Sequence, residues 1–413
     1  MPATTGQVYL GNTLISSVQV NDGWTRPTEW LPLPTATPAS VKILHAVFDQ
    51  DENYAAMRMV VVGGATYQVD WGDGVVDIVA SNTLVQHNYS FSNPVLAGTL
   101  TSQGYKQAII SVTPTTGTFS QCFLNPKSTT PAGLQNYATG FLDINLNLPN
   151  LIAGTTLQIG GAVRHGNLER VNITSWGAVT NLINLFNGCA KLQSCNETEW
   201  DMSAIVNIQN LFSGASSIKS LDCTNWNLSN CPNLQSAFNN CNSLGSIVFG
   251  SSTFPAATNM SGIFSNCTSL QAIDLSMWDV SNVTAINSAF NRCSALRDVN
   301  LNGWNTLAVT DANNMFINCN SLQKIPPLNL TNVTPSANMA SFASGCTSLV
   351  RMQASNIKVS FSVANCLLGS AALNEIYNNL ATVAGQTITV TGNYGTTGDN
   401  PSIATAKGWT VTG

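Results

Sequence analysis

The chain has 413 residues and combines a hydrophobic content of 44% with only 8% charged residues and a formal net charge of −5. This composition argues against a disordered chain, which pairs low hydrophobicity with high net charge. The lack of a lysine and arginine cluster argues against a nucleic-acid partner. No apolar run reaches the roughly 18–20 residues of a membrane span, so we expect no membrane insertion.

Residues 1–40 are rich in proline, and residues 8–15 have the pattern of a strand, a turn and a second strand. Extended proline-rich segments act as stiff linkers or bind partners. We therefore predict either a linker or an arm that attaches the protein to a larger assembly. The first residues lack the basic and apolar regions of a secretory signal peptide, so none is expected. The prolines are Pro27, Pro32, Pro34 and Pro38.

Residues 41–115 predict a β domain, because apolar and polar side chains alternate over residues 42–48 and 57–62. Residues 67–74 then place Val-Asp-Trp before Gly-Asp-Gly, and a His-Asn-Tyr sequence follows at residues 87–89. This pattern resembles the core motif of polycystic-kidney-disease (PKD) domains, with the order of the aromatic residue and the aspartate changed. The resemblance implies an immunoglobulin-like sandwich over residues 41–115.

Asp70 and Asp73 of this motif are weak candidates for calcium ligands. Calcium takes 6–8 oxygen ligands, and two carboxylates fall short of that number. The Gly72-Asp73-Gly74 sequence is typical of a tight turn, so hydrogen bonding within the turn is the preferred interpretation. We expect no metal ion and no other cofactor. Residues 116–154 are predicted to be a connector and the N-terminal cap of the next domain, with a strand at residues 142–148.

A strict sequence repeat, in which phenylalanine recurs at one fixed interval, is the strongest signal in the chain. Fixed periods of 20–50 residues indicate stacked supersecondary units, and the period of this repeat, 26, lies in the leucine-rich-repeat range. Stacked coils align like residues into internal ladders, which predicts a solenoid over residues 155–363. The phenylalanine ladder is Phe186, Phe212, Phe238, Phe264, Phe290, Phe316 and Phe342. The cysteine ladder, three residues further on, is Cys189, Cys241, Cys267, Cys293 and Cys319.

Within one coil, the end of residues 270–275 has the alternation of a short strand, and neighbouring strands should pair in parallel into one long sheet. Residues 283–290 space apolar side chains at helical intervals, which predicts a short helix or 3₁₀ turn on the opposite edge. The residue before each ladder cysteine is usually Gly or Asn, which tolerate a left-handed backbone. Arg292 departs from that rule.

Residues 264–270 and 278–284 carry a family resemblance. Their sequences, Phe-Ser-Asn-Cys-Thr-Ser-Leu and Trp-Asp-Val-Ser-Asn-Val-Thr, resemble the BspA-type leucine-rich repeat. The resemblance covers about half of the chain, and members of that family are mostly surface adhesins of bacteria and parasites. Related repeats occur in phage-encoded proteins. After the repeats, residues 364–413 predict a C-terminal cap with a helix at residues 367–377 and a strand at residues 387–391.

No grouping of residues in the sequence predicts catalysis. The three histidines, His45, His87 and His165, have no nucleophile placed near them by a motif. Glu197 and Glu199 are expected on a short strand, without the shared cleft that glycoside hydrolysis would require. The cysteines have no metal-ligand spacing and are expected to be reduced, buried and packed as small apolar groups. We therefore expect a protein that is not an enzyme.

The leading hypothesis is a bacteriophage virion protein: a tail-fibre, baseplate or head-decoration component that presents its solenoid to the host surface. Adhesion-type modules without an export signal, and with many free cysteines, are typical of a protein that folds in a reducing cytoplasm. The expected partners are other virion proteins at the N-terminal region, a host-surface glycan or protein, and further copies of the chain. A purely architectural cement protein of a capsid or tail and a bacterial surface adhesin are the alternatives.

Overall fold

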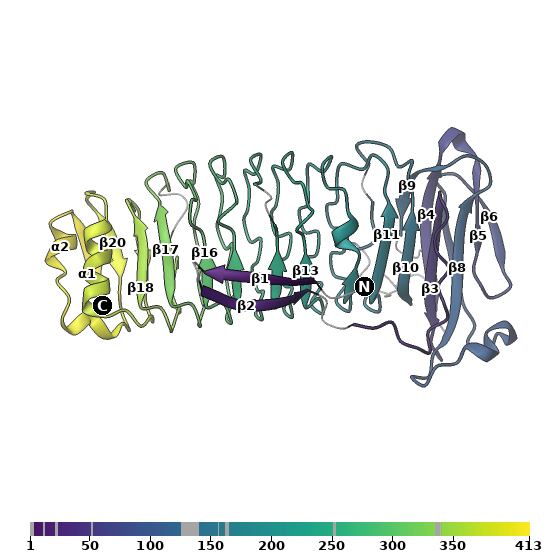
Figure 1. Ribbon diagram of the computed structural model, residues 1–413, viewed down its shortest axis with the longest axis horizontal. Helices are drawn as coiled ribbons and strands as arrows, with labels where there is room; N and C mark the ends of the chain where they lie inside the picture. The colour runs from purple at the N-terminus through teal and green to yellow at the C-terminus, as the bar shows by residue number, and fades with distance from the viewer. Residues whose placement is uncertain are drawn as a thin grey trace. The chain divides into compact units, whose positions relative to one another are not determined.

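The computed structural model describes residues 4–10, 13–20, 24–50, 53–124, 140–155, 157–161, 165–250, 253–334, 339 and 341–413. The chain is mainly β, and its repeating coils form a β-solenoid (Figure 1). It divides into two compact units. One is Gly23–Ile218, and the other is Lys219–Gly413 together with Met1–Asp22.

Two sheets make up most of the unit Gly23–Ile218. The larger sheet has seven strands in the order β12-β11-β10-β3-β8-β5-β6, and the smaller has three in the order β7-β4-β9. The larger sheet contains β12 (Ser194–Cys195), β11 (Arg170–Ser175), β10 (Phe141–Asn147), β3 (Ser40–Val47), β8 (Lys106–Pro114), β5 (Thr66–Asp70) and β6 (Val76–Ala80). The smaller contains β7 (Leu84–Asn88), β4 (Tyr54–Val61) and β9 (Phe119–Phe123). Three 3₁₀ helices, η1 (Val62–Gly64), η2 (Pro94–Thr99) and η3 (Glu197–Glu199), lie in the loops.

The core between the two sheets is built from alternate residues of each strand. Tyr67 on β5 and Phe119 on β9 are buried, with ring centroids 6.3 Å apart, so the sheets pack face to face. Trp71, which follows β5, is fully buried, and its indole Nε1 donates a hydrogen bond to the Asp77 carboxylate on β6 at 2.7 Å. The opposite residues of β6, including Ile78, are exposed, as the two-residue period of a strand requires.

The larger sheet runs without a break from the first of these strands into the first coils. β10 pairs antiparallel with β3 on one side and parallel with β11 on the other, and β11 pairs parallel with β12. The domain boundaries predicted at residues 115 and 154 therefore fall inside one hydrogen-bonded sheet. Residues 142–148, predicted as a capping strand, correspond to β10, and this strand joins the two regions.

The segment before β3 packs on the outer face of this sheet. Trp30 is buried with Leu44, Tyr105 and Leu142, and its indole Nε1 donates to the Tyr105 hydroxyl at 2.9 Å. Arg26 donates from Nε to the fully buried carboxylate of Asp143 at 2.9 Å and also bonds the carbonyl groups of residues 30 and 31. Residues 24–39 are thus fixed to the sheet by apolar packing and one buried ion pair.

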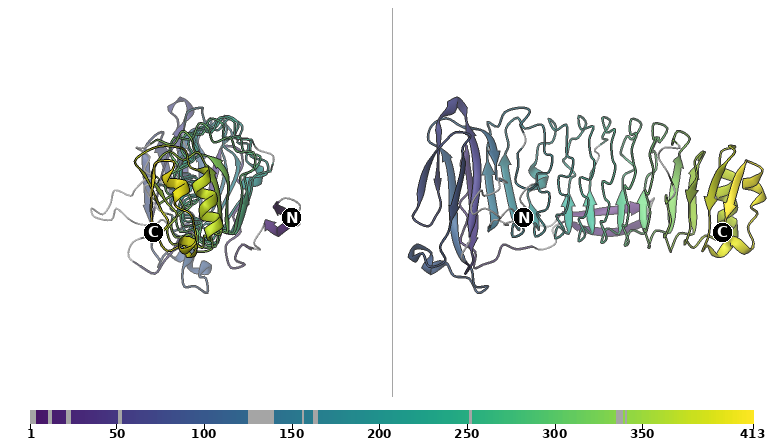
Figure 2. Two further views of the ribbon diagram at one scale, coloured as in Figure 1. Left: turned by 90° about the vertical axis from the view of Figure 1, so that its left-hand side faces the viewer. Right: turned by 180° about the vertical axis from the view of Figure 1, so that it is seen from behind.

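The second unit contains stacked coils whose short strands pair in parallel. Ser220 faces Ser246 and Ala272 faces Asp298, so paired residues are one repeat apart. The strands pair two by two rather than in the single long sheet that the sequence predicted. Figure 2 shows these coils side by side from behind. The strands are β13 (Ser220–Asp222), β14 (Ser246–Val248), β15 (Ala272–Asp274), β16 (Asp298–Asn300), β17 (Lys324–Asn329) and β18 (Arg351–Ser355).

The opposite edge of each coil is a series of turns, so the helix predicted as one alternative at residues 283–290 is wrong, whereas the other alternative, a 3₁₀-type turn, agrees with the hydrogen bonds there. Within the coil, the N–H groups of Ala289 and Asn291 bond to carbonyl groups three residues back. Alternating with them, the N–H groups of Ile286, Ser288 and Phe290 donate to the next coil at 2.8–2.9 Å. A helix would use every N–H within its own segment, whereas here about half of them link neighbouring coils.

Two left-handed residues in each coil make this alternation possible. Ser288 has a φ of 58° and Arg292, four residues on, also has a φ of 58°. Asn314 and Asn318 take the same conformation in the next coil, with φ of 55° and 59°. The sequence rule of a left-handed residue before each ladder cysteine therefore extends to Arg292, the position that was expected to depart from it.

The C-terminal residues contain the helix and the strand that the sequence predicted. The helix α1 (Ser370–Asn379) overlaps the prediction at residues 367–377, and β20 (Gln386–Thr389) overlaps the prediction at residues 387–391. β20 pairs in parallel with β19 (Phe361–Ser362) and β21 (Trp409–Thr412). A 3₁₀ helix, η4 (Tyr394–Thr397), and the short α2 (Ser402–Thr405) complete this part. Among the described residues, none of the helices has the length and apolar character to cross a membrane.

Of the strand–turn–strand predicted at residues 8–15, the two strands are confirmed, and the turn at residues 11–12 lies outside the described residues. β1 (Thr4–Leu10) and β2 (Thr13–Val20) pair antiparallel, with a register shift after Val8. They belong to the same compact unit as Lys219–Gly413. Whether residues 1–40 attach the protein to an assembly stays a prediction.

Candidate binding surface

The phenylalanine ladder lies inside the coils. All seven phenylalanines are buried. Ring centroids are 5.1 Å apart for Phe186 and Phe212, and 5.5 Å apart for Phe290 and Phe316. These two pairs are stacked, with interplanar angles of 25° and 4°. The ladder therefore holds neighbouring coils in register and presents no ring face to a ligand.

The cysteine ladder lies next to the phenylalanines, and its thiols are hydrogen-bond donors. Cys293 Sγ donates to the carbonyl oxygen of Phe264 at 3.0 Å, and Cys319 Sγ donates to that of Phe290 at 3.0 Å. Burial raises the pKa of the Cys293 thiol to about 12. Because the thiolate is the reactive form of cysteine, the raised pKa lowers the reactivity of this thiol. Packing volume, the basis of the sequence interpretation, is therefore only part of the reason for cysteine at this position.

Asp70 and Asp73 are both engaged in hydrogen bonds of the turn after β5. Asp70 Oδ1 accepts from the N–H of Gly72 at 2.9 Å, and Asp73 Oδ1 accepts from the N–H of Val75 at 3.2 Å. The other oxygen of Asp73 lies 2.8 Å from His87 Nε2. In the part of the chain that the structure describes, no group of three or more His, Cys, Asp or Glu side chains is arranged to hold a metal ion.

Four coils have a corner that begins at a tryptophan of the repeat, and we call these segments the tryptophan turns: residues 200–206, 226–232, 278–284 and 304–310. The residue after each tryptophan is Asp201, Asn227, Asp279 or Asn305, and each accepts a hydrogen bond from the N–H two residues on, at 3.0–3.2 Å. Hydrogen bonds from the hydroxyl and then from the N–H of the serine two residues on hold the pKa of the Asp201 and Asp279 carboxyls below the usual value.

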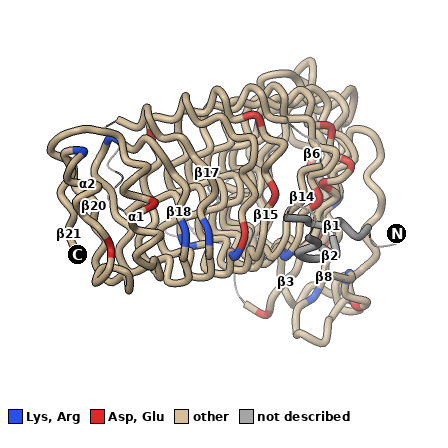
Figure 3. Tube along the Cα trace, turned by 60° about the vertical axis from the view of Figure 1, so that its left-hand side comes forward, with Lys and Arg blue, Asp and Glu red and all other residues tan. Residues whose placement is uncertain are grey.

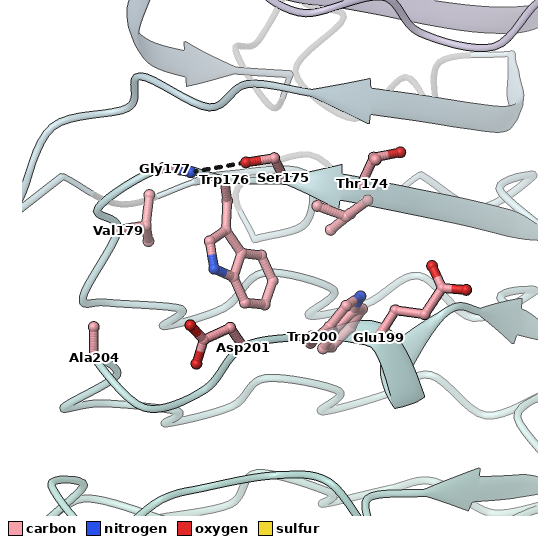
Figure 4. A pocket seen from close by; sticks show the side chains of 10 residues that line it. Thr174, Ser175, Trp176, Gly177, Val179, Glu199, Trp200, Asp201 and Ala204 are labelled. Carbon is pink, nitrogen blue, oxygen red and sulfur yellow. Dashed lines mark hydrogen bonds between the residues drawn. The ribbon is translucent and has the colours of Figure 1, made fainter.

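Two small polar hollows lie at tryptophan turns. The hollow at residues 173–204 has a volume of about 190 Å³ and is lined by Trp176, Trp200, Glu199 and Asp201. The two indole rings are 5.3 Å apart and tilted by 56°. Figure 4 shows Trp176 reaching toward the next coil, on which Asp201 and Glu199 stand on either side of Trp200. The second hollow, of about 270 Å³, is lined by residues 224–229 and Thr253.

The sequence did not predict these hollows. Glu199 was expected on a short strand, and this prediction is wrong, because Glu197 and Glu199 lie in η3. Glu197 is buried, whereas Glu199 lines the hollow. The sequence does show tryptophan followed by Asp or Asn at one position of the repeat. Because Asp and Asn favour Asx turns, this pair was the signal from which the turns could have been predicted.

Exposed threonines extend the tryptophan turns along the coils. Thr258, Thr284 and Thr310 occupy one position of the repeat in successive coils, and each is exposed. Each hydroxyl donates at 3.2 Å to a carbonyl oxygen of the preceding coil. A donating hydroxyl keeps its oxygen lone pairs available as acceptors. The row is therefore a fixed series of uncharged acceptors. Figure 3 shows how few charged residues the coils carry.

The comparisons with known proteins reach only the coils. Residues 162–249 and 249–351 each match the model of a family described as Mycoplasma protein of unknown function, DUF285. The comparison with curated proteins gave no match. The family match and the repeating coils are compatible with a BspA-like repeat protein.

Proposed function

We propose that this protein is a bacteriophage virion component of a tail fibre, a baseplate or a head decoration, and that its tryptophan turns attach to a glycan or protein of the host surface. The observation that carries the proposal is the row of three exposed threonines, Thr258, Thr284 and Thr310, together with the Asx turns at residues 201, 227, 279 and 305. The threonine hydroxyls are held by hydrogen bonds to the preceding coil and the Asx side chains by hydrogen bonds within their own turns, so little conformational entropy is lost on binding.

The chemistry of the turns favours an uncharged, hydroxyl-rich ligand. Threonine hydroxyls and Asn side chains supply hydrogen bonds without net charge. The two hollows lie at the same position of the repeat and could each receive part of a ligand. In one of them Glu199 and Asp201 offer carboxylate oxygens as hydrogen-bond acceptors. A repetitive polymer such as a surface polysaccharide would meet the same groups on successive coils. Attachment through several weak contacts gains from multivalency.

A binding experiment on purified protein tests this role. An array of bacterial surface polysaccharides, read with fluorescently labelled protein, should give a signal that the variant Thr284→Lys/Thr310→Lys lowers at least tenfold. The matched control, Gln271→Lys/Gln323→Lys, adds the same charge at exposed positions outside the tryptophan turns and should bind like the wild type. Equal binding by both variants, or no binding by the wild type to any polysaccharide or bacterial cell, would refute the attachment role.

A bacterial surface adhesin is the second candidate, and the family match favours it, because the description of that family names Mycoplasma. Both candidates use the same surface, so the array does not separate them. Immunogold labelling of the source does: label on virions supports the proposal, and label on bacterial envelopes supports the adhesin.

An architectural cement protein is the third candidate, and the edge strand β6 favours it. Val76 and Ile78 on this strand are 52% and 60% exposed, and among the described strands β6 pairs with β5 alone. Unpaired apolar edges are sites of protein–protein contact. If the variant Ile78→Lys abolished incorporation into particles while Thr284→Lys/Thr310→Lys had no effect on binding, the cement role would replace the attachment role.

We also propose that the two-sheet region is a PKD-like domain. The pairings β4 with β7 and β5 with β8 support it, since they match the central pairs of an immunoglobulin-like sandwich. The outer strands differ from that fold, because β3 pairs with β8 and β9 pairs with β4. A solved structure of residues 24–218 that superposed poorly on PKD domains would contradict the relationship.

A further inference from the structure

All three histidines of the chain lie in one column of rings, which is fully buried at His45 and His165 and partly exposed at His87. His87 stacks on Trp71 with centroids 4.9 Å apart, and its other neighbour is Tyr89 at 4.5 Å. Tyr89 stacks on His45 at 4.5 Å. The three histidines are far apart in the sequence, which gave no reason to expect contact. The column is therefore a product of the fold.

The column continues from the two sheets into the first coil. Phe141 at the start of β10 lies 5.7 Å from His45 and stacks on His165 at 5.0 Å. His165 precedes β11, the strand that pairs with β10. His45 is on β3, the other neighbour of β10. The rings thus cross the place where the two-sheet region meets the coils of the same unit.

His45 is fully buried, and no described residue offers a hydrogen bond to either of its ring nitrogens. The space around the ring is tight: a Cβ added to Gly140 would lie 2.9 Å from His45 Cε1. A neutral imidazole tolerates such surroundings, whereas an imidazolium ion without a counter-charge costs several kcal/mol. Protonation of His45 is therefore incompatible with the packed column.

The titratable groups that face His45 do not relieve this cost. Tyr89 and His87 pack on one side and His165 lies beyond Phe141 on the other, so the neighbours are neutral or cationic. The Asp73 carboxylate is bound to His87 at 2.8 Å. β8 contributes Ala108, which carries no charge, opposite His45. Burial, followed by the neighbouring histidines, lowers the pKa of His45 to about 3.

His165 has the same character. It is fully buried, and burial lowers its pKa to about 4, although hydrogen bonding to the backbone of Ile159 and Leu124 opposes the shift. Both folded pKa values lie below the ordinary value of 6.5, so the unfolded chain binds more protons than the folded one as the pH falls below 6.5. The contribution of the two neutral histidines to the free energy of unfolding is fully present above pH 6.5 and is lost progressively as the pH falls toward 4 and below.

From the column's position we infer that His45, Phe141 and His165 form an acid-sensitive joint, which fixes the two-sheet region to the first coil at neutral pH and releases it in acid. The site of release is specific, since β3, β10 and β11 are the strands that carry or adjoin these rings. The later coils contain none of the three histidines. An acid pulse should therefore open the unit Gly23–Ile218 before the coils of Lys219–Gly413.

Equilibrium unfolding of the full chain in urea, measured at pH 6.5, 6.0, 5.5 and 5.0, tests the joint. Two buried neutral histidines should raise the unfolding constant about 60-fold as the pH falls from 6 to 5, and one should raise it about eightfold. His45→Leu should therefore reduce this increase from about 60-fold to about eightfold. The control Phe141→Leu removes packing from the same column without a titrating group, so it should lower stability equally at every pH.

An unchanged pH dependence in His45→Leu would overturn the inference. If His45→Leu fails to fold, a measurement on the wild type tests the inferred joint instead. Hydrogen–deuterium exchange at pH 7.0 and pH 5.0, corrected for the intrinsic pH dependence, should show loss of protection at residues 40–47, 141–147 and 165–175. Residues 259–330 should keep theirs. Uniform loss, or loss that begins in residues 259–330, would equally overturn it.

Discussion

The carboxylate of Asp143 on β10 lies 2.9 Å from Arg26 Nε, and Arg26 belongs to the segment that precedes β3. Arg170 on β11 holds the other oxygen at 3.0 Å, and the Asp143 side chain is fully buried. One carboxylate therefore joins three parts of the unit that are far apart in sequence. Loss of one member of a buried ion pair leaves the remaining charges without a partner.

Asp143→Asn should lower the free energy of unfolding by about 3 kcal/mol. Urea unfolding followed by circular dichroism measures the change. The matched control is Glu375→Gln, which removes a carboxylate bonded to the exposed Arg351. That ion pair is solvated and screened, so its loss should leave the unfolding midpoint unchanged. Similar destabilisation by both variants would contradict the role assigned to Asp143.

Phe290→Ala should lower the free energy of unfolding by about 3–5 kcal/mol, because a fully buried ring is removed from between two others and leaves a cavity. Leu307→Ala serves as the control, since Leu307 is 47% exposed and its loss should change stability by less than about 0.5 kcal/mol. The ladder would be a poor description of the coils if the two variants unfolded at the same urea concentration.

Arg292→Asn should raise stability by about 0.5 kcal/mol, because the backbone at residue 292 has a φ of 58°, a conformation that costs an ordinary L residue energy and that Asn tolerates better. Arg297→Asn is the control, because Arg297 is exposed in the same coil and is not among the left-handed residues. Thermal unfolding at pH 7 compares the two, and a lower melting temperature for Arg292→Asn than for Arg297→Asn would count against left-handed strain.

Alkylation should separate the cysteines by burial. All eleven are free thiols, ten are buried, and Cys195 is half-buried. With iodoacetamide at pH 8, Cys195 should react first, whereas Cys189 and Cys293, whose pKa values are raised to about 12 by burial, should stay unmodified until the protein is denatured. Peptide mass spectrometry reads the result. Early modification of Cys293 in the native protein would contradict its place in the core.

The repeat made the coils predictable because packing acts identically on every copy. Phe290 and its equivalents could be assigned to the interior from their spacing alone, since a single coil cannot bury its own apolar edge. The helix predicted at residues 283–290 failed for a physical reason. Val283, Ile286 and Ala289 have helical spacing, but spacing does not say whether an N–H bonds within its own segment or to the neighbouring coil.

The contacts between residues far apart in the chain could not be predicted from the sequence. His45 and His165 meet around Phe141 only because β3, β10 and β11 are adjacent in one sheet. Neither residue has a neighbour in sequence that signals the contact. The hollow at Trp176 and Asp201 was missed likewise, because the Asx turn sets the direction of the Asp201 side chain, and one repeat position alone does not reveal the space between two coils.

The seven-stranded sheet of Gly23–Ile218 also determines how this unit bears a mechanical load. Its hydrogen bonds from β3 through β10 to β11 replace the flexible hinge that commonly joins two domains. A pull on β11 is therefore carried directly into β10 and β3, and the strand backbones must separate before the two-sheet region can rotate. If the protein attaches a particle to a host surface as proposed, this unit would transmit force as a stiff connection rather than as a flexible linker.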